Sequence, residues 1–547
     1  EIVVLKQLRE LSGHTQLVPE AARLSRVDVD SCHGIESEEL PAQIAAVALW
    51  LAGRQADMEL SASFGLGDAR PPLRKTPDIV RANALRLDWN EIVSRAGNET
   101  ETRLYILGNP PFVGKKVRSD AQNKDMELVF DGLRDHGVLD YACAWHVKAA
   151  DFILNTRIKV AFVSTNSITQ GEQVGVLWNC LREKKIKIHF AHRAFKWTNE
   201  TRGQAAVHCV IVGFAAFDTA RKHLYDYHTP TSDSHETACN NINPYLVAQP
   251  DVIMTNRKTP LSDVPPLVFG NMPNDGGNLL FGDEERADFL AREPRAEKFM
   301  LPLLSAHEFI NGENRWCLWL EGARADEWRE LPEVLKRVRA VRAYRLKSKR
   351  RATLKLAGTP HLFGEIRQPA TGYVLIPLHS SENRKYVPMA FFPPRHIVSN
   401  SCSALANATL YHFAVLTSNM HMVWLRQICG RIKSDYRYSN NLVYNNFPFP
   451  LEPHARQKAH AEEAAQTVLD ARAKYPVATL ARLYDPDSMP RDLLDAHRAV
   501  DSAVEACYGP RRFKTDLGRL ELLFALYRQY TAPLDGKRAP VFQRASC

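Results

Sequence analysis

The residues best suited to chemistry are Asn109-Pro110-Pro111-Phe112, which directly follow the short apolar stretch 104–107. In an open α/β sheet, ligands bind beyond the carboxyl ends of the strands, where a loop at this place would lie. The exocyclic amine of a nucleobase is a poor nucleophile because its lone pair is delocalised into the ring. If the Asn109 side-chain oxygen and the Pro110 carbonyl accept its two hydrogens, that lone pair can attack a methyl sulfonium. The two prolines restrict φ, and Phe112 offers a face on which an extruded base can stack.

Asn-Pro-Pro by itself is most often a turn, and four residues alone leave this alternative open. The neighbouring predicted strand ends favour the chemical interpretation. Glu36, at the end of the predicted strand 27–35, is placed to accept hydrogen bonds from ribose hydroxyls. Asn83-Ala84 lies at the end of the next predicted strand, where a side-chain amide could meet the adenine of a cofactor. This order and spacing fit the binding of S-adenosylmethionine.

Two aromatic residues follow a further predicted strand, 186–190. Phe195 and Trp197 could form a second wall around an extruded base. A core or loop aromatic is an equally good interpretation of Trp197, and Phe195 is the better candidate of the two.

Short apolar runs alternate with helical patterns over residues 1–235. The predicted strands are 27–35, 79–85, 104–107, 159–164, 186–190 and 206–214. Helical patterns cover 40–55, 140–154 and 174–184. This alternation predicts an α/β domain with a parallel, Rossmann-like methyltransferase sheet.

The character of the sequence changes after residue 235. From 236 to 451, Pro, Gly and Asn punctuate a mixture of strand-like stretches (315–320, 373–377, 396–399) and helical stretches (284–291, 331–345). This pattern predicts a separate mixed α+β domain. From 452 to 547 the predicted helices are 454–475, 491–508 and 515–530, which indicate a small helical C-terminal domain.

The composition is that of a globular protein of several domains, with 547 residues of which 45% are hydrophobic. The net charge of +9 permits a polyanionic partner. Ten Lys and Arg residues and no acid lie between 336 and 355, which suits either a phosphate-binding surface or a solvated helix face. Ten scattered cysteines without a CxxC pair argue against a metal site and against a disulfide framework. No signal peptide or membrane-length apolar run is found, so we expect a soluble cytoplasmic protein.

Several long motifs resemble those of adenine-N6 DNA methyltransferases. They are GIE at 34–36, PAQIAAVALWL from Pro41, NALRLDW at 83–89, GNPPFVGKK from Gly108, VSTNSI at 163–168 and RAFKWTNE at 193–200. The sequence is most similar to the MmeI-like type IIL restriction–modification enzymes. That resemblance continues to GRIKSDYRYSNNLVYNNFPFP at 430–450 and covers nearly the whole chain.

The resemblance implies transfer of a methyl group from S-adenosylmethionine to the N6 amine of a flipped adenine in duplex DNA. Asn109 to Phe112 would then be catalytic, and Glu36, Asn83, Ala84 and Asn109 would bind the cofactor. Residues 236–451 would form the target-recognition domain. The basic residues expected to contact DNA are Lys115, Lys116, Arg337, Arg345, Lys349, Arg350, Arg351, Arg367 and Arg437.

In this family a nuclease and a helical spacer usually precede the methyltransferase, within a bacterial or archaeal cytoplasmic protein. The chain starts at Glu1 within a helical pattern. We therefore expect that the nuclease, and the first strand with its glycine-rich cofactor loop, lie before Glu1.

Two alternatives stay open. One is an amino-methyltransferase acting on cytosine N4, RNA or a protein glutamine, because the same acceptor pair suits each of these amines. The other is a catalytically incomplete DNA-binding or specificity fragment. Identification of the methylated base separates the first from the main interpretation, and a calorimetric titration with S-adenosylmethionine separates the second.

Overall fold

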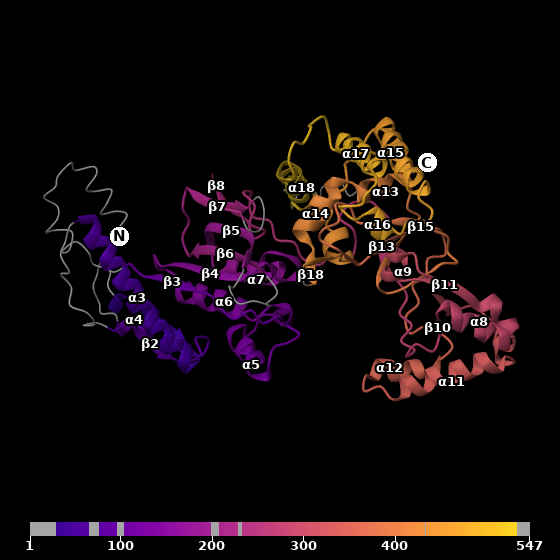
Figure 1. The fold of residues 1–547 in the computed structure, drawn as a ribbon, viewed down its shortest axis with the longest axis horizontal. Coiled ribbons are helices and arrows are strands. Elements are labelled where there is room, and N and C mark those ends of the chain that lie inside the picture. Colours follow the sequence, from indigo (N-terminus) through magenta and orange to yellow (C-terminus); the bar gives the residue numbers. More distant parts are fainter. Residues whose placement is uncertain are drawn as a thin grey trace.

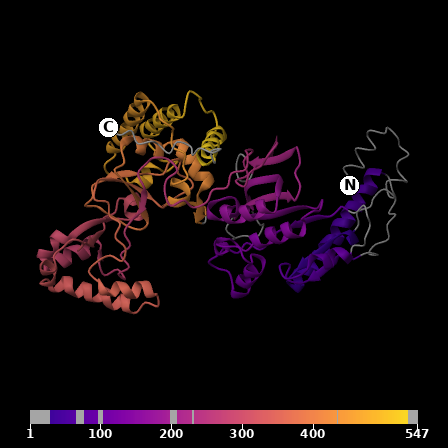
Figure 2. The ribbon, with the colours of Figure 1, turned by 180° about the vertical axis from the view of Figure 1, so that it is seen from behind.

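The computed structural model describes residues 29–64, 76–95, 103–197, 207–227, 232–432 and 434–532. Along the longest axis, the chain extends from helix α3 (Glu39–Phe64) at one end to a lobe with α8 (Asp283–Arg292) and α11 (Pro332–Leu346) at the other (Figures 1 and 2). A six-stranded sheet lies between these ends. None of the described helices is both long and apolar enough to span a bilayer.

The six-stranded sheet is mixed, whereas the sequence predicted a parallel one. Its strands, in spatial order, are β3 (Tyr105–Gly108), β4 (Lys159–Thr165), β6 (Val207–Ala215), β5 (Lys187–Trp197), β7 (Lys222–Tyr227) and β8 (Ser234–Cys239). β3 is parallel to β4, and β6 is antiparallel to both β4 and β5. β3, β4 and β5 therefore end at the same edge. β7 and β8, which the sequence analysis missed, extend the far side of the sheet.

A separate two-stranded parallel sheet is formed by β1 (His33–Glu36) and β2 (Asp78–Arg81). The predicted strand 27–35 is wrong in its first half, because Val29–Ser31 forms a 3-10 turn and residues 27–28 lie outside the described ranges. The predicted strand 79–85 is likewise too long, since a turn follows at 84–86. Helix α3 packs against β2, and its exposed apolar residues are Leu40, Ile44, Val47, Leu51 and Met58.

Helices α5 (Asp120–Val129), α6 (Cys143–Phe152) and α7 (Gly171–Glu183) accompany the six-stranded sheet, and α4 (Trp89–Arg95) follows β2. Ser119 and Gln122 form a capping box at the start of α5. His146 of α6 is buried against the rings of Phe162 and Phe214 from the sheet. Burial disfavours the imidazolium and lowers the pKa of His146 to about 4, so the neutral ring packs as a core aromatic.

Residues 236–451, the predicted target-recognition domain and called the recognition part below, contain three small sheets among their described residues. Their strands are β9 (Leu267–Phe269), β10 (Leu280–Phe281), β11 (Met300–Leu304), β12 (Trp316–Leu318), β13 (Tyr373–Pro377), β14 (His379–Ser380), β15 (Ala390–Phe392), β16 (Ile397–Val398), β17 (Cys402–Ala406), β18 (Gly430–Ile432) and β19 (Asp435–Arg437). The sheet orders are β10-β12-β11-β16, β15-β13-β17-β9 and β14-β19-β18. The helices here, besides α8 and α11, are α9 (Ala306–Asn311), α10 (Ala325–Arg329), α12 (Arg351–Lys355), α13 (Leu410–Thr417) and α14 (Asn419–Ile428). The predicted strand 373–377 and both predicted helices are confirmed.

One half of the recognition part has a core of its own. We call residues 279–366 the recognition lobe, because buried residues such as Phe281, Phe289 and Val341 form a cluster separate from the main core. The other half shares its core with the C-terminal helices α15 (Ala455–Ala473), α16 (Leu480–Leu483), α17 (Arg491–Cys507) and α18 (Asp516–Thr531). The ring of Trp424 in α14 lies 6.0 Å from that of Phe524 in α18.

The part of the chain around the six-stranded sheet contacts the recognition part at the start of α7. Gly171 has a φ of +65°, and a Cβ added to it would lie 2.9 Å from the Cα of Gly430 in β18. Real Cβ atoms essentially never approach backbone that closely. A glycine is therefore required here both for the left-handed backbone and for the contact with the recognition part.

We expect Gly171→Ala to destabilise the protein by about 2–4 kcal/mol, of which about 1 kcal/mol is the left-handed backbone and the rest the clash with Gly430. Gly132→Ala is the matched control, because Gly132 has a φ of +74° with nothing within 4 Å of the added Cβ. Urea unfolding followed by circular dichroism measures both. Equal losses of stability in the two variants would contradict a tight backbone contact at Gly171.

Candidate active site

The predicted catalytic loop begins where β3 ends. Gly108 is the last residue of the strand and Asn109 is the first of the loop. Asn109 is exposed, Pro110 is buried, and the Phe112 side chain is 36% exposed. Within the described ranges, neither the Asn109 side chain nor the Pro110 carbonyl has a hydrogen-bond partner. Both acceptors suggested by the sequence thus have no partner among the described residues.

Gly108 sets the position of the loop relative to the sheet. A Cβ on Gly108 would lie 3.0 Å from a ring carbon of Phe162 on β4, so the missing side chain allows the two strands to pack closely. Phe162 is in register with Val212 of β6, which is in register with Ala191 of β5. β3 ends at this row, whereas β4 continues to Thr165 and β5 to Trp197. The loop therefore starts beside its neighbouring strands, not beyond their ends.

Main-chain and guanidinium contacts hold the loop from behind. The Tyr141 N–H donates to the Val113 carbonyl at 2.9 Å, one residue after Phe112. Further along, the Arg118 guanidinium donates to the Leu139 carbonyl at 3.2 Å. The segment before α6 thus supports the loop on both sides of Lys115 and Lys116.

A hydroxyl and amide cluster fixes that supporting segment. Asp140 accepts a hydrogen bond from the Ser167 hydroxyl at 2.5 Å, and its N–H donates to the Gln173 side-chain oxygen at 2.9 Å. The Thr165 and Ser167 hydroxyls are 2.5 Å apart at the end of β4. The sequence analysis missed this cluster because Asp140 is 27 residues from Ser167. The polar run VSTNSI directly after an apolar strand was the available signal.

The Asp125 carboxylate joins three donors from different parts of the chain. It accepts from the Tyr141 hydroxyl at 2.6 Å, from Arg86 Nε at 2.6 Å and from Asn83 Nδ2 at 3.0 Å. Burial opposes ionisation of Asp125, but these hydrogen bonds outweigh it and hold the pKa of the carboxyl below its usual value. The Asn83 oxygen accepts from the Leu85 N–H. The Asn83 amide thus has a protein partner at each end, which the cofactor prediction did not foresee.

Glu36 ends β1 as predicted, half-buried and next to β2. One carboxylate oxygen, Oε1, accepts from the main-chain N–H of Ser37 at 2.8 Å and of Glu38 at 3.2 Å. These bonds orient the side chain, while Oε2 accepts no hydrogen bond within the described ranges. An oriented carboxylate with one oxygen left over suits a ribose hydroxyl.

Phe195 and Trp197 lie within β5, so their predicted place after the end of a strand is wrong. The cause is a bulge between His192 and Phe195, which breaks the apolar alternation but not the strand. The Phe195 ring is 5.4 Å from Tyr227 of β7 and 6.1 Å from Trp197, whose side chain is 38% exposed. Both aromatics belong to the part of β5 that extends past the end of β3.

Arg345 is buried inside the recognition lobe, so its predicted DNA contact is wrong. Its side chain is fully buried, and its N–H groups donate to the carbonyls of Pro273, Asn274, Leu356, Thr359 and Leu362 at 2.7–3.1 Å. This arginine clamps irregular backbone and has no donor left for a phosphate. A basic pattern on a helix could not distinguish it from its exposed neighbours.

Arg337 is partly exposed and has protein partners, and its predicted DNA contact stays a prediction. Its guanidinium pairs with Glu285 of α8 and lies 4.5 Å from the centre of the Phe281 ring. Among the other predicted DNA contacts, Arg367 is exposed and pairs with Glu365. The remaining predicted DNA contacts are exposed and have no ion pair within the described ranges: Lys115, Lys116, Lys349, Arg350, Arg351 and Arg437.

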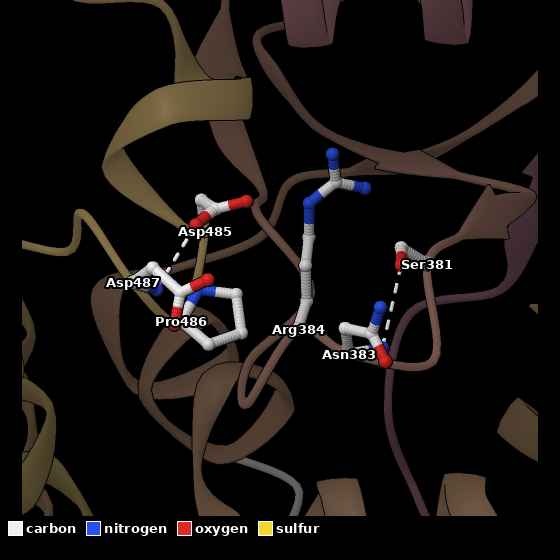
Figure 3. A pocket seen from close by; sticks show the side chains of 6 residues that line it. All are labelled: Ser381, Asn383, Arg384, Asp485, Pro486 and Asp487. Carbon is white, nitrogen blue, oxygen red and sulfur yellow. Dashed lines mark hydrogen bonds between the residues drawn. The ribbon is translucent and has the colours of Figure 1, made fainter.

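A pocket of about 370 Å³ lies between the recognition part and the C-terminal helices (Figure 3). It is lined by Ser381, Asn383, Arg384, Asp485, Pro486 and Asp487. The Arg384 side chain extends between the two walls of the pocket. Burial lowers the pKa of Arg384, while nearby Asp435 and Asp485 oppose this change. None of the predicted site residues lines the pocket, so it is separate from the loop at Asn109.

Comparison with known proteins gives matches along almost the whole chain. Residues 1–226 match a family model described as MmeI, DNA-methyltransferase domain, residues 248–451 match MmeI, target recognition domain, and residues 453–535 match MmeI, C-terminal domain. The predicted fold classes of the three parts are thereby confirmed. The predicted boundaries at 235 and 451 stay predictions.

Two relatives illustrate the similarity. DNA methyltransferase A of Bacillus subtilis (strain 168) is 39% identical over 97% of this chain and 59% of its own length, so the chain spans less than two thirds of that protein. The structure of the type IIL restriction–modification enzyme MmeI in complex with DNA is 44% identical, with a TM-score of 0.80 over 97% of this chain and 71% of that chain.

Arg345→Ala should lower the free energy of unfolding by about 3 kcal/mol, because several buried carbonyls lose their charged donor at once. Arg342→Ala is the matched control on the same helix. Arg342 is exposed and makes no contact of this kind, so its loss should stay within about 0.5 kcal/mol. Urea unfolding measures both variants, and a small effect of Arg345→Ala would contradict the clamp.

Proposed function

Because this chain belongs to the MmeI family of restriction–modification enzymes, we propose that it transfers a methyl group from S-adenosylmethionine to the N6 amine of an adenine in duplex DNA. The observation that carries the proposal is the pair of unoccupied acceptors on Asn109 and Pro110, directly after a strand end. The enzyme acts at specific sites and is part of a restriction–modification system.

The loop activates the amine by accepting its hydrogens. The Asn109 side-chain oxygen takes one and the Pro110 carbonyl takes the other, which turns the nitrogen lone pair out of conjugation with the ring. Pro110 is buried and the following Val113 is held by Tyr141, so the second acceptor is fixed before the base arrives. Preorganised acceptors of this kind stabilise charge that develops only in the transition state.

The residues at the ends of β1 and β2 suit S-adenosylmethionine, which supplies the electrophilic methyl group. Glu36 offers one carboxylate oxygen to a ribose hydroxyl. Asn83 and Ala84 follow the neighbouring strand, but the Asn83 amide already has protein partners. We therefore expect the cofactor's adenine to contact the main chain of this turn and the second N–H of the Asn83 side chain. The Asn83 amide as a whole is not available, because its oxygen and its other N–H already have protein partners.

The target adenine leaves the duplex to reach the loop, and aromatic faces replace the stacking that it loses. Phe112 is next to the acceptors, and Phe195 and Trp197 stand on the strand that extends past the loop. Unstacking costs a few kcal/mol, which contacts elsewhere on the DNA must offset. The need for these contacts would account for the large size of the recognition part.

Duplex DNA is bound by basic residues that project from the recognition lobe and from the β18–β19 hairpin. Lys349, Arg350 and Arg351 are suited to phosphates, and Arg437 on β19 is suited to a base edge. Lys115 and Lys116 supply phosphate contacts beside the catalytic loop. A cytoplasmic location follows from this substrate.

A binding module without methyl transfer is the second candidate function. It is favoured by one observation: in the described parts of the chain, β1 and β2 form a sheet separate from β3–β8, so no strand pairing there joins the expected cofactor residues to the Asn109 loop. Isothermal titration calorimetry with S-adenosylmethionine discriminates the two, because only the methyltransferase requires the cofactor to bind.

Asn109→Ala in the full-length protein should lower methylation of unmethylated genomic DNA by about 10²–10³-fold, because one of two preorganised acceptors is lost. Tritium transfer from labelled S-adenosylmethionine gives the rate, and mass spectrometry of digested DNA identifies the base. Affinity for duplex DNA should stay within about twofold, because one exposed amide contributes little to a phosphate-dominated interface. Asn90→Ala, which removes an exposed amide on α4, is the control and should retain full activity.

Retained methylation in Asn109→Ala would contradict the proposed role of the loop. Methylation found on cytosine N4 would reassign the substrate while leaving the acceptor chemistry in place.

The double variant Arg350→Ala/Arg351→Ala should reduce the slope of log affinity against log salt concentration by about 1.8, since each phosphate contact contributes about 0.9. Fluorescence anisotropy with a labelled duplex at several salt concentrations gives the slope. Arg512→Ala/Lys514→Ala removes two exposed charges from the C-terminal part and should leave the slope unchanged. An equal change in both double variants would show that only net charge matters.

A further inference from the structure

Asp125 is a carboxylate that the proposed chemistry does not use, yet it is among the most completely engaged side chains near the loop. It is 2% exposed and lies on α5, next to the buried Met126. Its two oxygens accept from Asn83, Arg86 and Tyr141. A buried charge persists in a protein only when such partners offset its desolvation. These partners belong to two different segments, the turn after β2 and the segment before α6.

On one side, Tyr141 leads to the catalytic loop. Its hydroxyl binds Asp125 at 2.6 Å, and its N–H binds the Val113 carbonyl at 2.9 Å. Val113 in turn donates to the Pro111 carbonyl at 3.1 Å. Tyr141 alone therefore links the Asp125 carboxylate to the backbone that carries Pro110 and Phe112.

On the other side, Asn83 and Arg86 lead to the turn after β2. Among the residues that the structure describes, no strand pairing joins β1 or β2 to β3. Two polar contacts do join this turn to the six-stranded sheet and its helices: the Asp125 junction, and the bond from Lys148 Nζ to the Leu85 carbonyl at 2.9 Å. Leu85 itself is buried in the main core. Within the described residues, the position of this turn relative to the six-stranded sheet is therefore held by the packing of Leu85 and by the side chains around Asp125.

We propose that Asp125 and Tyr141 are positioning residues, which set the catalytic loop at a fixed distance from the turn at residues 83–87 and so align the target amine with the methyl donor. The proposal rests on the proposed function for its consequence, because that turn would face the cofactor. Its structural content, one junction that holds two segments, is independent of any reaction.

Tyr141→Phe and Asp125→Asn break the junction in different ways. The first removes a single hydroxyl and leaves the main-chain bond to Val113 in place, so only the link between the segments is lost. The second turns an amide N–H group toward donors from Arg86 and Asn83, so the turn after β2 is released as well. In-line transfer is sensitive to displacements of about 1 Å, which cost about 10²-fold in rate.

In the full-length protein, with unmethylated genomic DNA as substrate, we expect kcat to fall about tenfold in Tyr141→Phe and about 10²-fold in Asp125→Asn. KM for S-adenosylmethionine should rise only in Asp125→Asn, and KM for DNA in neither. The double variant should lose no more than Asp125→Asn alone, because both changes act on one junction. Tyr530→Phe removes a matched hydroxyl, which donates to the Phe449 carbonyl at 2.9 Å among the C-terminal helices, and should keep kcat and both KM values.

Hydrogen exchange measured by mass spectrometry tests the junction without any reaction. Amides at 83–89 and 111–118 should both exchange about tenfold faster in Asp125→Asn than in wild type, and only those at 111–118 in Tyr141→Phe. Unchanged exchange in both segments, or a wild-type kcat in Tyr141→Phe, would overturn the positioning role. If wild type transfers no methyl group, the proposed function fails, and the exchange pattern still decides whether the junction exists.

Discussion

The parallel pairing of β3 with β4 is the constraint on which the candidate site depends. It places Gly108 against Phe162, where no side chain larger than hydrogen fits without displacing the ring. It also brings the end of β3 to the edge that β4 and β5 share. Asn109 emerges there by necessity, while the longer β5 carries Phe195 past it on the same edge. Chemistry at this edge thus follows from strand direction and strand length before any side chain is considered.

Strand pairing does not account for the other half of the site. Among the described residues, β1 and β2 form a sheet of their own, so side chains hold Glu36 and the turn after β2 relative to Asn109. Buried charged and polar groups are expensive unless they are satisfied. A carboxylate with three donors is specific in its geometry, whereas apolar packing alone would tolerate slippage between the two sheets. This explains why a charge lies on the buried face of α5.

The sequence predicted what depends on local pattern and missed what depends on long-range partners. Apolar alternation located β4, and the position of Asn109 after a strand was predictable from four residues and their context. The prediction for Phe195 was wrong because of the bulge in β5. The apolar alternation of the sequence breaks at the bulge, but the strand continues through it. The prediction for Arg345 was wrong for a different reason. Its charge resembles that of Arg350 in the sequence, and only the fold shows that buried carbonyls surround it.

Helix α7 contacts both the β18–β19 hairpin and the segment that supports the Asn109 loop. At its start, Gly171 touches the backbone of Gly430 in β18, and two residues later Gln173 holds Asp140 behind the loop. The β18–β19 hairpin and the segment behind the Asn109 loop both contact the first turn of α7. They cannot move far apart without breaking one of these contacts. The proposed site-specific methyl transfer needs that rigidity, because the modified base must lie at a constant distance from the base pairs that are recognised. Under the proposed function, the close glycine contact therefore limits how far the hairpin can move relative to the loop.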